Sequence, residues 1–485
     1  VDEIDYSEQQ LVSNYADQIA AKGNKVFLTC RTAVFPKGVF SSDFKIFECV
    51  GFNAAQRRKF LKLWFDDDLN RAMLIEKEIA NNIGTAGISR NPLLLSLIAM
   101  NFEKNIKFKL PQKRIYIYLK SIQLLLERRE EKNIWSIPIE TRINLLEYIA
   151  YEMNIRNIDV IEVDLLRTII NEWKEHHIDS TINQYRIDDF MQLLDIDGVL
   201  YHCSKKQLRF LHLVLQECLA ASYLSKQKDW FDIFKSKMYF PRWEETLRLL
   251  ISLVTQNNIQ NDMLADYLFD QKNDDRDNLF LIGRYISDFD SSNAKKFLNI
   301  FNDILSYLLS DSYQYNYTEA IVALASICNT HTNYRDYMFN CFKKDLQESY
   351  KSIYIYINLL KLIPSRASKR EVLRLIHIFS SGNFKREVSI RIIGMLIDSL
   401  EWYYDFEFWK DIYIKYVNTT NSYLSGVIAS TLSNIQMTEM YEFIKEEYEK
   451  GDSYINLLLS YIIQKYENEE YTRDLIITAI YKQEI

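Results

Sequence analysis

The sequence predicts a mostly α-helical protein of several domains that opens with a short α/β segment. Its 485 residues exceed what one hydrophobic core supports, so roughly two to four domains are expected. Only 11 Gly and 6 Pro occur, whereas sheets and tight hairpins need these residues at their turns. The 33 Tyr and 27 Phe provide bulky side chains that amphipathic helices can bury.

The composition also narrows the function classes. A formal net charge of −7 provides no general basic surface for nucleic acid. The six cysteines are scattered without CxxC spacing, which favours buried free thiols in a reducing compartment. No stretch approaches the roughly 20 apolar residues of a membrane-spanning helix. We therefore expect a cytoplasmic protein without a membrane partner. Because Val1 does not resemble a natural start, the true N-terminus is expected upstream.

Residues 1–50 have the pattern of an α/β fold. Lys25–Cys30 and Phe44–Val50 are short apolar runs that suit buried parallel strands, and Ser7–Ala21 suits a crossover helix. A sheet of two strands cannot stand alone, so further strands are expected before Val1. We assign this segment to the C-terminal part of a larger α/β domain.

Residues 51–110 predict a small helical domain. Asn53 can cap a first helix, and a second helix follows from about Leu69. A third helix is expected to open at Asn91-Pro92, where proline suits a position in the first turn.

Residues 111–225 predict helices followed by a β-hairpin. Helical patterns cover Arg114–Arg129, Thr141–Met153, Val163–His176 and Ile187–Leu194. Two short strands, Gly198–Cys203 and Gln207–Leu211, come next, and a closing helix covers Val214–Leu224. This order describes a winged-helix domain.

Residues 226–485 predict helix after helix. Leu247, Leu250, Ile251 and Val254 follow the i, i+3, i+4, i+7 rule, and later segments repeat it. We expect an α-solenoid of HEAT type, although no clean repeat period is present. An irregular helical bundle is the competing interpretation.

The first candidate site residues lie near the N-terminus. Val1 followed by Asp2 and Glu3 resembles the end of a Walker B motif, whose carboxylates organise Mg²⁺ and a hydrolytic water. Alone, a solvated acidic terminus is the simpler explanation. Arg31 follows the strand Lys25–Cys30, and neighbouring parallel strands end at the same ligand-binding edge. Its planar donor group can contact a γ-phosphate there, although alone it would be taken for a surface arginine.

Further motifs follow in a characteristic order. They are Asn91-Pro92-Leu93-Leu94-Leu95, then Leu110–Arg114 leading into Tyr118, then Phe210-Leu211-His212 with Gln216-Glu217 and Ala220-Ala221 behind it, and finally Pro241–Glu245. In this order they resemble a NACHT-family STAND NTPase, from the second half of the NACHT domain onwards. The resemblance covers roughly residues 1–250, and the later helical region adds no sequence-specific support.

The resemblance implies a role for each matching residue. Asp2 and Glu3 would be the Walker B acids and Arg31 the sensor arginine. Pro92 would pack against the adenine or its ribose side. His212 would reach the β-phosphate of ADP and so hold the winged helix shut. The implied cofactors are ATP or ADP with Mg²⁺. Without the resemblance, Pro92 would simply start a helix and His212 would be a core histidine satisfied by backbone.

Part of the nucleotide site has no match in the sequence. No G-x-x-x-x-G-K-[ST] loop occurs, and the Mg²⁺-binding Asp that normally precedes the Gly of Walker B is missing as well. Both are expected upstream of Val1, so the parent protein is expected to be a slow ATPase and this chain alone to be inactive. His176-His177 and His202-Cys203 lack further ligands at suitable spacing, so no metal site is expected from them.

The resemblance implies an ATP-dependent signalling switch. ADP would hold the nucleotide-binding, helical and winged-helix parts closed. An unknown protein ligand sensed by the solenoid would open them, ATP would replace ADP, and the protomers would oligomerise. Assembly would activate an effector domain N-terminal to this chain, in innate, anti-phage immunity.

Two other functions compete with the switch. The first is a non-enzymatic helical scaffold with a degenerate nucleotide fold. The second is a transcription regulator that places its winged helix on DNA, which requires a basic recognition helix. The segment Arg186–Asp197 instead carries four Asp and one Arg, a composition that repels phosphate. Nucleic acid is therefore not expected as a partner.

Overall fold

The computed structural model describes residues 6–28, 51–52, 54–66, 68–81, 88–104, 109–111, 113–130, 137–176, 182, 184–271, 276–289, 294–310, 317–345, 350–363, 366–380, 386–400 and 406–416, together with 427, 428, 431 and 443. This part of the chain contains twenty α-helices and one small three-stranded sheet, which confirms the predicted mostly helical fold class. The chain divides into two compact units, residues 1–51 and 52–485.

The first unit contains helix α1 (Tyr6–Ala21), as the sequence predicts. The helix ends where Gly23 adopts a positive φ of 82°, and the Gly23 amide donates to the Ala20 carbonyl over 2.9 Å. The Asn24 side chain also donates to the Ile19 carbonyl, over 3.2 Å. A left-handed glycine is a common way to end a helix and satisfy its last carbonyls.

The predicted strand Lys25–Cys30 is wrong over residues 25–28, which form no strand. A strand is stable only when a neighbouring strand accepts its backbone hydrogen bonds, and the described part of this unit has no second extended segment beside it. The rest of that prediction, and all of Phe44–Val50, lie outside the described residues.

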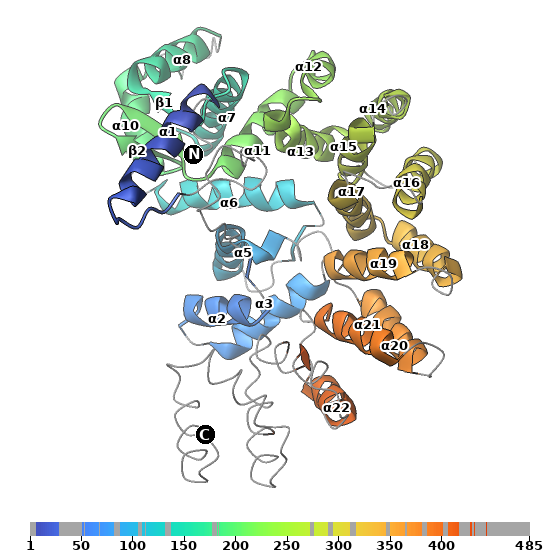
Figure 1. Cartoon of the computed structure of the whole chain (residues 1–485). Helices are drawn as coiled ribbons and strands as arrows, with labels where there is room; N and C mark the ends of the chain where they lie inside the picture. Colours follow the sequence, from blue (N-terminus) through green and yellow to red (C-terminus); the bar gives the residue numbers. More distant parts are fainter. Residues whose placement is uncertain are drawn as a thin grey trace, which may run out of the picture. The chain divides into compact units, whose positions relative to one another are not determined.

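The second unit begins with a small group of helices (Figure 1). These are α2 (Ala54–Trp64), α3 (Leu69–Asn81), a short 3₁₀ turn η2 (Ile88–Arg90) and α5 (Pro92–Lys104). One face of α5 carries Leu95 and Phe102 into a core shared with α2 and α3. Another face carries Leu94 and Leu97 into the core of the following helices. Helix α5 is therefore buried on two sides, which explains its run of apolar residues.

Four helices and a small sheet follow. The helices are α6 (Arg114–Arg128), α7 (Ile139–Ile155), α8 (Val163–His176) and α10 (Ile187–Asp197). The strands are β1 (Ile161–Glu162), β2 (Leu200–Ser204) and β3 (Gln207–Phe210), and α11 (Leu213–Ser225) comes directly after them. Strand β3 lies between β1 and β2 and pairs antiparallel with both. The sequence predicts β2 and β3 but not β1.

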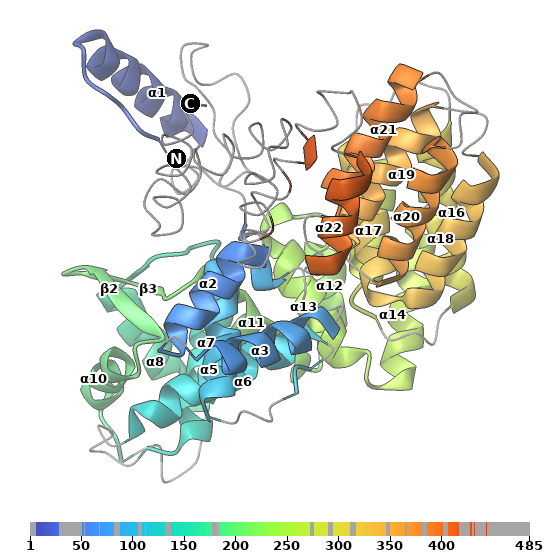
Figure 2. The ribbon, with the colours of Figure 1, turned by 90° about the horizontal axis from the view of Figure 1, so that it is seen from below.

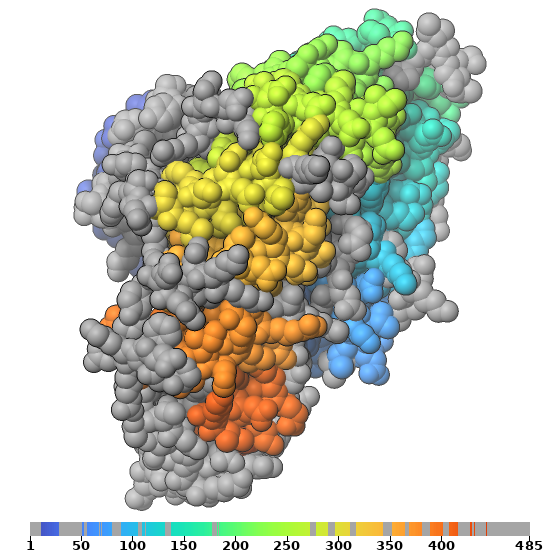
Figure 3. Space-filling view, turned by 90° about the vertical axis from the view of Figure 1, so that its right-hand side faces the viewer, coloured from blue at the N-terminus to red at the C-terminus, as the bar shows by residue number. Residues whose placement is uncertain are grey.

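The remaining described helices alternate between two layers (Figure 2). They are α12 (Trp230–Lys237), α13 (Glu244–Val254), α14 (Asn258–Asp270), α15 (Arg276–Ile286), α16 (Ala294–Leu309), α17 (Tyr317–Thr330), α18 (Thr332–Asp345), α19 (Tyr350–Leu362), α20 (Arg366–Ser380), α21 (Arg386–Asp398) and α22 (Phe406–Tyr416), with a 3₁₀ turn η4 (Pro241–Trp243) before α13. Helix α13 packs on α15, α15 on α17 and α17 on α19, while α14 packs on α16. On the face in Figure 3 the colours run in sequence order from green to orange, so successive segments lie beside one another.

Helix α11 joins the hairpin segment to this helical stack. It packs against α7 on one side and α13 on the other. Its Leu215 and Leu219 are fully buried, as are Leu146 of α7 and Leu250 of α13. A helix that is apolar all round is expected to be enclosed in this way. One continuous core therefore crosses the predicted boundary at residue 225.

The structure also bears on the predictions of buried thiols and of no membrane-spanning helix. Cys218 and Cys328 are buried free thiols, whereas Cys203 in the hairpin is exposed. Burial raises the pKa of both buried thiols above the usual value. None of the helices in the described part of the chain combines the length and apolar character that a membrane crossing requires.

Candidate functional site

The five predicted site residues fall into two groups. Asp2, Glu3 and Arg31 lie outside the described residues, so their predicted contact with Mg²⁺ and the γ-phosphate stays a prediction. Pro92 and His212 both lie in the second unit, and each stands at the start of a helix.

Pro92 is the first residue of α5. Asn91 caps this helix, because its Oδ1 accepts hydrogen bonds from the Leu93 amide (2.9 Å) and the Leu94 amide (3.3 Å). Proline suits the next position because a first-turn residue has no use for an amide hydrogen. The helix-start interpretation of Pro92 is thus sufficient for the fold. Its ring is exposed, so the same residue also presents an apolar surface to a ligand.

His212 is the N-cap residue of α11. Its backbone is extended (φ −154°, ψ 147°), and its Nδ1 accepts a hydrogen bond from the Val214 amide over 3.1 Å. The side chain is half-buried. An accepting Nδ1 carries no proton, so the neutral ring holds its proton on Nε2. The ring therefore caps the helix with one nitrogen and has a donor on the other.

The helices that begin at these two residues pack on the same neighbour. Helix α5 packs against α6, and α6 packs against α11. The caps already occupy most first-turn amides: Asn91 accepts from Leu93, Leu94 and Leu95, and His212 accepts from Val214 and Leu215. The positive end of each helix dipole still favours an anion.

A buried polar network holds α11 in place. Gln216 donates to the Asn154 side chain (3.2 Å) and to the Ile158 carbonyl (3.1 Å), and Asn154 donates to Thr246 Oγ1 over 2.8 Å. The network joins α11 to α7 and α13. Paired polar groups in an apolar core specify one arrangement, because any shift leaves a buried group unsatisfied. The sequence motif that begins at Phe210 includes Gln216, but it did not predict this anchoring role.

The Ala220-Ala221 pair of the same motif is also structural. Both residues are fully buried, and their small side chains let α11 approach α7 closely. Beside them the Glu147 carboxylate, itself buried, accepts from Ser222 Oγ over 2.6 Å and from Lys226 Nζ over 2.5 Å. These bonds satisfy the carboxylate and attach α11 to α7 a second time.

Two further motifs, Leu110–Arg114 and then Pro241–Glu245, contact each other where α6 packs against α13. Arg114 of the first donates to Glu245 of the second over 2.5 Å and lies 3.6 Å from Asp288. Arg248 donates to the same Asp288 over 2.7 Å. Burial disfavours the charge on Arg114, but the attraction of Glu245 and Asp288 outweighs it, so the pKa of Arg114 is raised above its ordinary value. These two motifs therefore contact each other through charged side chains between α6 and the helical stack.

The acidic residues of α10 all have structural partners. Asp188 pairs with Arg167, Asp195 with His202, and Asp197 with Arg142, while Asp189 accepts from the Arg186 amide at the helix N-terminus. Burial raises the pKa of Asp197 to about 6 even though Arg142 attracts its charged form. Asp189 and Asp197 are thus buried in the fold, whereas Asp188 and Asp195 form their pairs at the surface.

In the described part of the chain, no group of three or more His, Cys, Asp or Glu side chains is arranged to hold a metal ion. A scan against protein-family models finds no match for this chain, and a search of the curated proteins finds no relative.

Proposed function

We propose that this chain belongs to a cytosolic NACHT-type STAND switch, whose nucleotide controls the contact between a winged helix and a nucleotide-binding domain. The domain order would be the tail of a P-loop NTPase domain, a helical domain, a winged helix and a HEAT-like solenoid. The observation that supports this best is His212. It stands at a helix N-terminus with its Nδ1 occupied by the cap, which makes Nε2 the hydrogen-bond donor.

The described residues fit a nucleotide in their chemistry. A ring N–H at the positive end of a helix dipole suits a phosphate oxygen, and an exposed proline ring suits the face of a base or the edge of a ribose. ADP or ATP with Mg²⁺, when bound, supplies the phosphate charge that these groups recognise. Asp2, Glu3 and Arg31 are proposed to contact Mg²⁺ and the γ-phosphate.

The first unit supports an α/β domain that continues beyond α1. Leu11 and Tyr15 stand one helical turn apart on α1 and are 66% and 65% exposed, and Phe27 is 87% exposed. The parallel sheet of an α/β domain covers such apolar faces. We include a phosphate-binding loop in that proposed domain, and with it a slow ATPase activity.

The attachment of α11 explains how a phosphate contact could act at a distance. His212 starts the helix that packs on α13, the first long helix of the stack. A contact made in only one nucleotide state shifts the balance between two arrangements by its own free energy. Release at His212 would therefore move α11 together with the helical stack. In this proposal a protein ligand at the stack favours the released state, opened protomers oligomerise, and an N-terminal effector is activated in anti-phage immunity.

Size-exclusion chromatography with light scattering tests this proposal on the full-length protein. ADP should keep it monomeric, and ATP with the sensed ligand should produce an oligomer. His212→Asn should oligomerise with ATP alone, because the closed state loses its phosphate contact. A full-length protein that binds neither nucleotide and never changes its mass would instead support the helical-scaffold alternative.

A further inference from the structure

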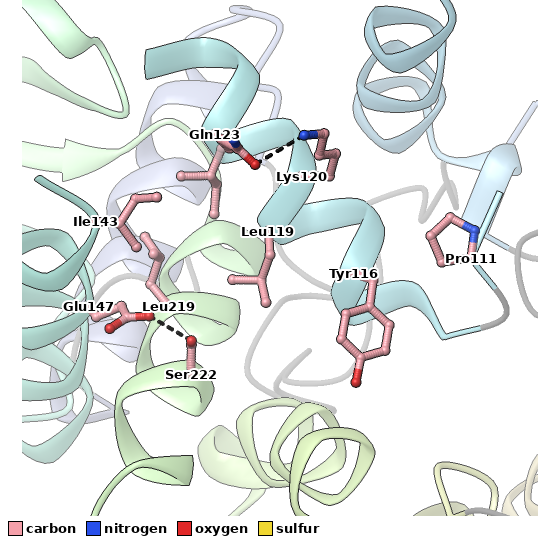
Figure 4. Close-up of a pocket in the computed structure, with 10 residues that line it drawn as sticks. Pro111, Tyr116, Leu119, Lys120, Gln123, Ile143, Glu147, Leu219 and Ser222 are labelled. Carbon is pink, nitrogen blue, oxygen red and sulfur yellow. Dashed lines mark hydrogen bonds between the residues drawn. The ribbon is translucent and has the colours of Figure 1, made fainter. Parts of the chain in front are cut away.

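A groove runs between α6, α7 and α11 on the second unit (Figure 4). Its volume is about 490 Å³. It is lined by Pro111, Tyr116, Leu119, Lys120, Ile122, Gln123, Ile143, Glu147, Leu219 and Ser222. This volume lies in the range of small-ligand sites, which are mostly apolar with a few polar groups. None of the roles proposed above uses this groove.

The walls of the groove are apolar side chains from three helices. Tyr116 and Leu119 stand three residues apart on α6, which places them on one side of that helix, as Figure 4 shows. Ile143 of α7 adds to these walls, and the buried Leu219 of α11 lies beneath them. Tyr116, Leu119 and Ile143 are only half-buried, so the groove exposes apolar surface that an apolar ligand would cover.

The charges along the groove are unevenly satisfied. Glu147 forms an ion pair with Lys226 and accepts a hydrogen bond from Ser222, and its side chain is only 3% exposed. Lys120 is half-buried, and its Nζ donates to Gln123 Oε1 over 3.1 Å. Lys120 forms no ion pair with any residue that the structure describes. The Gln123 side chain also donates to Glu127 Oε1 over 2.8 Å, and Glu127 itself is paired with Lys104. Among the described residues, Lys120 therefore has an amide oxygen and no carboxylate in direct contact with its charge.

We propose that this groove binds a small amphiphile with an apolar body and one anionic head group such as a carboxylate. The body would cover Tyr116, Leu119 and Ile143, and the head would accept a hydrogen bond from Lys120 Nζ. A cationic ligand is disfavoured, because Lys120 repels it and Glu147 is already paired and buried. An uncharged ligand would bury Lys120 further without a partner, which costs free energy. This site is independent of the proposed nucleotide switch.

Displacement of anilinonaphthalene sulfonate fluorescence tests the proposal on the full-length protein. Two amphiphiles of equal chain length and opposite charge compete with the dye: sodium decanoate and decyltrimethylammonium, both below their micelle concentrations. Decanoate should displace the dye at concentrations about tenfold lower than the cation. Lys120→Gln should weaken decanoate about tenfold and remove this preference. Lys77→Gln, an exposed lysine on α3, is the matched control and should change nothing.

A second variant addresses the apolar half of the site. Leu119 lies at the half-buried rim, so the larger side chain in Leu119→Trp should fill the groove. The variant should then bind no dye that decanoate or decyltrimethylammonium displaces, while circular dichroism confirms that the helices persist. Equal displacement by the two amphiphiles, or decanoate binding that survives Leu119→Trp, would overturn the proposal. Displacement by a synthetic Leu- and Glu-rich amphipathic peptide but not by decanoate would also overturn it, in favour of a protein partner.

Discussion

Replacing His212 by alanine removes two interactions, and the structure shows how to separate them. The first is the cap, in which Nδ1 accepts from the Val214 amide over 3.1 Å. The second is the proposed contact from Nε2 to a phosphate. His212→Asn keeps a side-chain acceptor at the N-cap, where asparagine is among the preferred residues, but loses the second ring nitrogen, Nε2. His212→Ala loses both.

The expected magnitudes follow from these two interactions. Loss of an N-cap acceptor costs about 1 kcal/mol, so the Val214 amide in His212→Ala should exchange its hydrogen about fivefold faster. His212→Asn should change this rate little. A hydrogen bond to a charged group contributes about 1.5–3 kcal/mol, so both variants should bind ADP roughly 10- to 100-fold more weakly.

Hydrogen exchange followed by mass spectrometry and ADP titration of the full-length protein provide the two measurements. His176→Asn, at the exposed end of α8, is a matched control that should alter neither. If His212→Asn binds ADP as tightly as the unchanged protein while His212→Ala does not, then His212 serves only as a cap. The phosphate contact would be refuted in that case.

Three further predictions concern the hairpin segment and the thiols. Gly198 has a φ of +62°, and a Cβ there would stand 2.1 Å from Arg129 Nη1. Gly198→Ala should therefore lower the free energy of unfolding by about 1–2 kcal/mol. Urea titration measures this change, and an unchanged midpoint would contradict it. Folding raises the pKa of Asp197 from 3.8 to about 6, so the folded chain binds this proton more tightly than the unfolded chain does. Lowering the pH from about 7 to about 4 should therefore stabilise the unchanged protein relative to Asp197→Asn by an amount on the order of 3 kcal/mol, and a pH-independent difference between their urea midpoints would refute the shift. Exposed Cys203 should react with a disulfide reagent at once, whereas buried Cys218 should react only on unfolding; equal rates would show that α11 is not enclosed.

Helices with a strong one-sided pattern were predictable from the sequence. Val163–His176 is predicted with the bounds that α8 has, because its apolar residues repeat at helical spacing and its acidic start and basic end mark the termini. Strand β1 was not predictable in this way. It has two residues, and Ile161 pairs with Leu208, far along the chain, so no local pattern marks it.

The capping role of His212 was not predictable from the sequence. The motif around His212 directs attention to the start of α11, but histidine is not among the preferred capping residues, so the sequence does not indicate the cap. Gln216 was missed as an anchor because its partner Asn154 lies 62 residues away and the next bond, to Thr246, spans 92. Contacts over such separations depend on tertiary packing.

The acidic helix α10 shows the same limit. From composition, its four aspartates predict a surface that repels phosphate. In the structure Asp197 is buried against Arg142, and Asp189 caps the helix with its backbone contact to Arg186. Composition reports how many charges an element has, whereas their partners decide which of them reach a ligand.

The nucleotide content of the full-length protein, purified without added nucleotide, tests the central proposal most directly. After denaturation, the released nucleotides can be identified and counted by ion-exchange chromatography. The unchanged protein should carry stoichiometric ADP, and His212→Asn should carry a strongly reduced amount. A folded, full-length protein that carries no nucleotide and takes up neither ADP nor ATP when they are added would contradict it.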